Sequence, residues 1–128
     1  MRAAGRSPTS TRATTALARP DQAKFRKKVL AAYGNTCLLT GFGLAEALQA
    51  GHIVPVENNG PDELGNGICL RADIHSLYDK GHIKIAPDGT VLLSDAAKVI
   101  PAYAALPKKI VWPKFVFSDA VAWRYRYC

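Results

Sequence analysis

The sequence predicts an α+β fold in which a short antiparallel β pair is followed by a helix and then by a β-hairpin. Three observations carry this prediction. Apolar residues recur at helical spacing between residues 21 and 33. Two short apolar segments flank a loop at 57–67 that is rich in glycine and asparagine. Residues 82–94 alternate in polarity around a Pro-Asp-Gly turn. A length of 128 residues suits one domain.

The first predicted helix begins after Pro20, with Asp21 as its cap, and Gly34 ends it. Its apolar stripe consists of Phe25, Val29, Leu30 and Tyr33. The opposite face carries three basic residues, Arg26, Lys27 and Lys28. We expect these three side chains to contact backbone phosphates of a nucleic acid.

The next elements are shorter. Residues 37–43 read as a strand-like piece and residues 44–50 as one or two helical turns. Residues 52–56 are β-branched and predict a strand, which pairs antiparallel with a second strand at 68–70. A helix is expected from about 72 to 80, with Gly81 just beyond its end.

The last third begins with the hairpin and then holds Pro101, Pro107 and Pro113. These prolines predict an extended path, because each lacks a backbone donor and restricts its neighbours. Asp119 is expected to cap a short final helix at 120–128.

Charge is concentrated at the N-terminus. The formal net charge is +7, and residues 1–28 hold eight basic side chains against one acidic. Residues 1–19 show no periodicity and predict a flexible basic arm, followed by a domain at 20–128. A basic arm favours a polyanionic partner, because neutralised phosphates release counterions, although solubility alone would also explain it. No apolar run is long enough for a membrane span, and no secretory signal is recognisable.

The three cysteines are Cys37, Cys69 and Cys128, with no CxxC pair among them. An odd number without such pairs argues against a disulfide framework and against a structural zinc site. The apolar surroundings of Cys37 and Cys69 indicate reduced thiols in the core. A reducing cytoplasmic location is therefore expected.

Four residues around the β pair and its helix can carry chemistry. His75 and Asp79 are spaced i, i+4, so they lie on one helical face and can share one divalent ion. His52 has the side chain that a hydrolytic general base requires. Asn66 could orient that imidazole or brace the loop before it. Taken singly, each of these residues is more often structural than catalytic.

Their spacing adds weight, because fourteen and then nine residues separate His52, Asn66 and His75. The segment AGHIVPVENNGPDELGNGICLRADIHSLYDKG closely resembles the HNH endonuclease family, whose ββα-metal core has this order. Within this family, the sequence most resembles a branch that has a CxxTG segment, an AHI-like strand, an NGxxLRADxHxLFD core, a DG hairpin and a final helix. The matching pieces are residues 37–41, 51–53, 66–79, 88–89 and 123–125.

The resemblance implies phosphodiester hydrolysis at a single metal. By the family's pattern His52 takes a proton from water, and His75 with Asp79 holds the metal that stabilises the charge on the phosphate and on the leaving 3′-oxygen. The family's middle asparagine holds the loop and orients the base, a role that carries over to Asn66.

The chain departs from the family at Gly51, where many members have an additional metal ligand before the base. A site with two side-chain ligands suits Mg²⁺ or Mn²⁺ better than Zn²⁺ or Ni²⁺. Asp73 is a candidate further ligand, although a first-turn acid is the simpler interpretation. Arg71 either reaches a phosphate or ties down the loop through Glu57 or Asp62.

The expected function is an endonuclease acting mainly on DNA, with RNA as the other substrate class. No predicted element resembles a major-groove reader, so sequence specificity would come from a homodimer or from a fused or separate targeting domain. The alternative is a nucleic-acid-binding module whose nuclease site has decayed. A structural zinc protein is the weakest reading, because the cysteines are unpaired.

Overall fold

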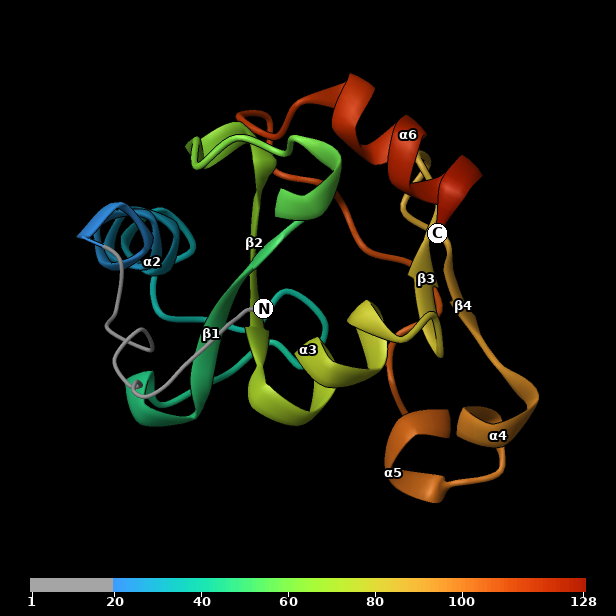
Figure 1. Ribbon diagram of the computed structural model, residues 1–128. Coiled ribbons are helices and arrows are strands. Elements are labelled where there is room, and N and C mark those ends of the chain that lie inside the picture. The colour runs from blue at the N-terminus through green and yellow to red at the C-terminus, as the bar shows by residue number, and fades with distance from the viewer. Residues whose placement is uncertain (1–19) are drawn as a thin grey trace, which may run out of the picture.

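The computed structural model describes residues 20–128. The expected arm at 1–19 lies outside the described residues. Two small antiparallel β pairs and the helices around them make up the fold (Figure 1). One pair, β1–β2, stands in the middle, with α2 on one side and α3 on the other (Figure 1).

Helix α2 spans Pro20–Ala32 and covers one face of the β1–β2 ribbon. Phe25, Val29 and Leu30 are buried in the core, as their spacing predicts. The helix ends before Gly34, whose φ of +62° lies in the left-handed region that glycine adopts without strain.

Strands β1 (Leu48–His52) and β2 (Gly67–Arg71) pair antiparallel, with Leu48 opposite Arg71 and His52 opposite Gly67. β2 confirms the strand predicted at 68–70 and extends it by one residue at each end. The first strand was expected at 52–56 and lies earlier, so the predicted helical turns at 44–50 reduce to a 3₁₀ turn, Ala45–Ala47.

The shift of β1 has a physical cause. The backbone N–H and C=O of Val54 bond to the side chain of Asn66, so this residue cannot continue the ladder. Pro55 lacks a backbone donor and ends any extension. The 37–43 segment was wrongly predicted as strand-like, because its backbone closes a turn in which Gly41 N–H bonds to Cys37 O.

Helix α3 (Ala72–Asp79) follows β2 without a connecting loop. Ile74 and Tyr78 are buried, and Gly81 has a φ of +80°, which confirms the predicted end of the helix. This direct strand-to-helix junction places the polar face of α3 beside β1.

The predicted hairpin is confirmed as β3 (Ile83–Ile85) and β4 (Val91–Leu93). The region after it is less extended than predicted, because two short helices interrupt it, α4 (Asp95–Lys98) and α5 (Pro101–Ala104). Ser94 caps α4, and Pro101 occupies the first turn of α5, where a missing N–H costs nothing.

Helix α6 (Ser118–Tyr127) closes the chain and packs against β3 near the upper edge of the ribbon (Figure 1). The final helix is thus confirmed, but Asp119 lies inside its first turn rather than at the cap. Within residues 20–128, no helix is both long and apolar enough to span a bilayer.

The core lies between α2, the β1–β2 ribbon, α3 and α6. Its fully buried members include Phe25, Ile53, Ile74 and Tyr78. Cys37 and Cys69 are buried there as free thiols, as predicted. The core therefore holds β1 and α3 as one packed unit.

Candidate active site

His52 occupies the last position of β1, where its ring is held by two contacts. It stacks on Phe25 of α2, with ring centroids 4.2 Å apart and an interplanar angle of 11°. Its Nε2 lies 2.7 Å from Oδ1 of Asp62 in the loop between the two strands. The His52 side chain retains 13% of its exposure, so it is restrained yet reaches the surface.

Asn66 is fully buried and braces the loop that carries Asp62. Its amide donates to the carbonyls of Val54 and Pro61, and its oxygen accepts from Val54 N–H. Asn66 was expected either to orient the imidazole of His52 or to brace the loop. In the structure it braces the loop, and the polar partner of the His52 ring is Asp62.

His75 and Asp79 lie on the same face of α3, with His75 Nε2 3.2 Å from Asp79 Oδ2. The other ring nitrogen, Nδ1, is 2.7 Å from Oε1 of Gln49 on β1. Because an amide oxygen only accepts, Nδ1 carries a proton; Nε2 then donates to Asp79 when it is also protonated, and offers its lone pair to a cation when it is not.

The Asp79 carboxylate is kept ionised by its neighbours. Burial would raise the pKa of Asp79, but the hydrogen bond from His75 and the charges of His75, Arg124 and His52 outweigh it. The pKa of Asp79 therefore lies below its ordinary value, and the group is an anionic oxygen donor at neutral pH.

This donor set fits a divalent cation. Two ligands in neighbouring octahedral positions, each about 2.1 Å from Mg²⁺, lie roughly 3 Å apart. The imidazole nitrogen and carboxylate oxygen have that separation. Among residues 20–128 no group of three or more metal-binding side chains occurs, so water and phosphate would complete the shell.

Gly51 lies directly against this pair. A Cβ at position 51 would sit 2.9 Å from His75 Nε2 and 3.2 Å from a methyl group of Ile68. The position that often holds a ligand in the family therefore gives room here to the imidazole of His75.

One cavity of about 550 Å³ joins the two halves of the site. His52, His75 and Asp79 all line it, together with Glu57, Lys80 and Arg124. A volume of this size falls in the range of pockets that hold nucleotide-sized ligands. His52 and the His75–Asp79 pair therefore border the same space.

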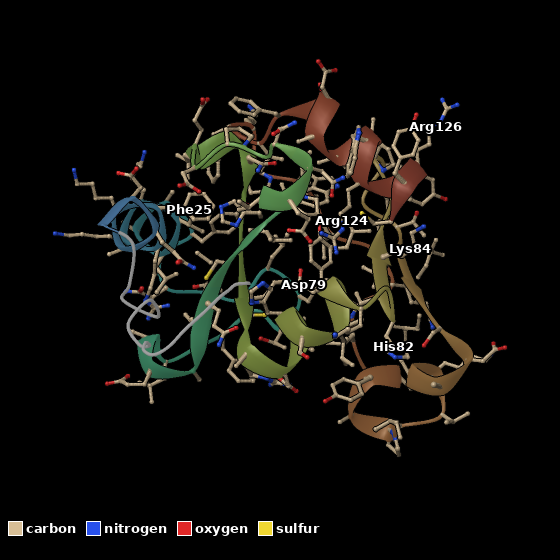
Figure 2. The ribbon with its side chains drawn as sticks, viewed as in Figure 1. Phe25, Asp79, His82, Lys84, Arg124 and Arg126 are labelled. Atoms are coloured by element: carbon tan, nitrogen blue, oxygen red, sulfur yellow. The ribbon has the colours of Figure 1, made fainter. Side chains whose placement is uncertain are left out.

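Arg124 is a site residue that the sequence did not single out. It reaches from α6 into the interior and donates to the carbonyls of His52, Ile53 and Tyr78 (Figure 2). Its guanidinium also stacks over the Tyr78 ring at 3.9 Å. Arg124 thus ties the end of β1 to the end of α3.

The basic residues expected to contact nucleic acid divide into two groups. Arg26 donates to the carbonyls of Leu48 and Ala45, and Arg71 forms a bidentate pair with Asp73. Arg71 is therefore tied to Asp73 rather than to Glu57 or Asp62. Lys27 and Lys28 are exposed on α2.

Asp73 and His82 also form hydrogen bonds within the protein. Asp73 accepts from Arg71 and from the hydroxyl of Tyr103. His82 is half-buried, with Nδ1 2.7 Å from Ser94 Oγ. Neither residue lines the cavity.

The contacts that Gln49, Asp62 and Phe25 make with the two histidines were not predicted, and the reason differs for each residue. With β1 predicted too late, Gln49 fell in a supposed helical turn, and its shared strand face with Gly51 went unrecognised. Asp62 lay in a polar loop, where sequence gives no orientation. Phe25 read correctly as a core residue, and its stacking on His52 follows from tertiary packing.

Residues 37–86 match the family model described as HNH endonuclease, which confirms the resemblance for the part that carries His52 and His75. No curated protein matches the chain. Among solved structures, the chain is similar to a modification-dependent TagI restriction endonuclease, with 23% identity and a TM-score of 0.60. The match covers 80% of this chain and 36% of that one, and it establishes the likeness of fold.

Proposed function

We propose that this protein is a metal-dependent endonuclease that hydrolyses phosphodiester bonds in DNA, as the match of residues 37–86 to the HNH endonuclease model suggests. The observation that carries the proposal is the single cavity shared by His52, His75 and Asp79. A general base on one wall and a cation site on the other form the minimal set for attack of water on a phosphate.

In this proposal His52 is the general base. Its ring is restrained by Phe25 and Asp62 and borders the cavity, so it can take a proton from a water beside the phosphate. The resulting hydroxide attacks phosphorus in line, and the P–O bond to the leaving oxygen breaks on the opposite side.

His75 and Asp79 hold the divalent ion, with Mg²⁺ or Mn²⁺ favoured by the sparse, oxygen-rich shell. When bound, the ion supplies positive charge that stabilises the phosphate oxygens during the displacement. Gln49 orients His75 through Nδ1, and such a partner strengthens an imidazole ligand.

Binding of the nucleic acid backbone is assigned to exposed lysines. Lys80 lines the cavity, while Lys27 and Lys28 extend from α2. Arg26 and Arg71 are already paired within the protein, so we assign them positioning roles. These contacts are to phosphate, so recognition of particular sequences would need a homodimer or a targeting domain.

The test is incubation of purified protein with plasmid DNA and a parallel RNA, in Mg²⁺ or Mn²⁺ and in chelator. We expect metal-dependent cleavage that falls by about 100-fold or more in His52→Ala and in His75→Ala, as loss of a general base or a metal ligand does. The matched control is His82→Ala, which removes the third histidine outside the cavity. Equal cleavage by His52→Ala and the wild type would reject the proposed roles.

A decayed binding module is the second candidate, favoured by the glycine at position 51 and the two-ligand site. Metal titration monitored by calorimetry separates the two candidates. Salt-sensitive DNA binding without a bound cation would support the module, whereas a cation lost on His75→Ala would support the nuclease.

A further inference from the structure

We propose that Asp62 is the positioning residue of the base: it holds His52 in the tautomer protonated on Nε2, so that Nδ1 accepts the proton of the attacking water. This inference rests on the proposed nuclease function and names the residue that prepares its base.

The contact between the two side chains sets the tautomer. His52 Nε2 and Asp62 Oδ1 are 2.7 Å apart, a short distance typical of a charge-assisted hydrogen bond. An ionised carboxylate has no proton to give, so the proton in this bond belongs to Nε2. The neutral ring then carries its lone pair on Nδ1.

The stack on Phe25 fixes a different degree of freedom. Nearly parallel rings at 4.2 Å hold the plane of the imidazole. A half-turn about the Cβ–Cγ bond would return the ring to the same plane, with each nitrogen in the place of a carbon. The bond to Asp62 is lost on such a flip, so it selects one of the two faces.

Asp62 is itself held by the buried asparagine. The amide of Asn66 donates to the carbonyl of Pro61, the residue immediately before Asp62, at 3.1 Å. Asn66 therefore acts on His52 through the loop, without touching the imidazole. This path gives a physical account of an asparagine that braces the loop and also orients the base.

The carboxylate also matches the charge that develops during the reaction. When Nδ1 takes the proton, His52 becomes an imidazolium beside an anion at hydrogen-bond distance. Asp62 is only one-third exposed, so solvent screens this pair incompletely. The carboxylate therefore lies next to the ring on which the positive charge develops.

The experiment compares Asp62→Asn, Asp62→Glu and the matched control Glu63→Gln, which changes the neighbouring exposed acid. Two readouts are used: cleavage of plasmid DNA with Mn²⁺, and the ¹⁵N chemical shifts of the His52 ring without metal or DNA. Thermal unfolding of each variant verifies that it folds.

In the wild type we expect the Nε2–H tautomer. Asp62→Asn can turn its amide and donate to Nε2, so we expect a shift toward Nδ1–H and a fall in kcat of roughly 10- to 100-fold, the range for loss of an orienting partner. Asp62→Glu is expected to recover part of the Nε2–H tautomer and part of kcat. Glu63→Gln is expected to match the wild type in both measurements.

An unchanged tautomer in Asp62→Asn, or an unchanged kcat, would overturn the positioning role while leaving the nuclease function in place. A wild-type protein that fails to cleave would instead overturn the proposed function. The ring shifts would then still report whether Asp62 selects the tautomer, so the two failures are distinguishable.

Discussion

Arg124 Nη2 lies 3.9 Å from Asp79 Oδ1, which connects the final helix to the proposed metal ligand (Figure 2). The same guanidinium donates to backbone carbonyls at the ends of β1 and α3. Because α6 lies outside the segment 37–86, the site depends on a residue beyond the matched core.

Replacing Arg124 should loosen both halves of the site. In Arg124→Met three carbonyls and the Asp79 carboxylate lose a buried cationic partner, so we expect a loss of about 2–4 kcal/mol in the free energy of unfolding. Cleavage should also fall at temperatures where the variant is folded. Urea unfolding and plasmid cleavage measure the two effects. Arg126→Met, on the exposed side of the same helix, is the control and should be near neutral.

Gly51→Ala should weaken metal binding. The added methyl group would lie 2.9 Å from His75 Nε2, so the imidazole must shift from its position beside Asp79. We expect metal affinity to fall by roughly 10-fold, as for other displacements of a ligand's support. Calorimetric titration with Mn²⁺ measures it. An affinity equal to the wild type would mean that His75 Nε2 is not a ligand.

Asn66→Ala should be among the most destabilising substitutions in the loop. It leaves the Val54 N–H and two carbonyls without the fully buried side chain that bonds them. We expect a loss of about 2–3 kcal/mol in the free energy of unfolding. The exposed Asn58→Ala is the comparison and should change stability by less than about 0.5 kcal/mol.

The Arg71–Asp73 pair should give an acid-dependent contribution to stability. The hydrogen bond from Arg71 lowers the pKa of Asp73; burial opposes this, and the Tyr103 hydroxyl adds to the lowering. Its stabilisation is therefore complete above the unfolded pKa of about 3.9 and is lost as pH falls through the lower folded pKa.

Because Asp73 is partly exposed, we expect Asp73→Asn to cost only about 0.5–1 kcal/mol at pH 7. The difference from the wild type should disappear as the pH falls below about 4. Urea unfolding at several pH values measures this. A difference that stays constant down to pH 2 would contradict the assignment.

The thiols should react unequally. Burial raises the pKa of Cys69 to about 11, with Cys37 adding to the shift, so this thiol stays protonated at pH 8. Cys128 is exposed and lines the cavity. Under native conditions a thiol reagent should label Cys128, and all three cysteines only after unfolding. A bulky label there should slow cleavage, whereas Cys128→Ser should be insensitive to the reagent.

Local patterns predicted much of the fold. The stripe at Phe25, Val29 and Leu30 gave α2, the Pro-Asp-Gly turn gave the β3–β4 hairpin, and Gly81 marked the end of α3. These signals are local, because each depends on the periodicity or on the allowed dihedral angles of neighbouring residues. The bounds predicted for β1 were wrong because the side chain of Asn66 takes the backbone hydrogen bonds of Val54, so the strand cannot extend through that residue.

By itself the sequence determined the residue types, the i, i+4 spacing that brings His75 and Asp79 together, and the resemblance of residues 37–86 to the HNH endonuclease family. Tertiary structure decided which groups hold them: Asp62 and Phe25 for His52, Gln49 for His75, and Arg124 for the junction between strand and helix. The physical reason is that these contacts join separate elements. Their geometry arises only when the core packs α2, the ribbon, α3 and α6 together.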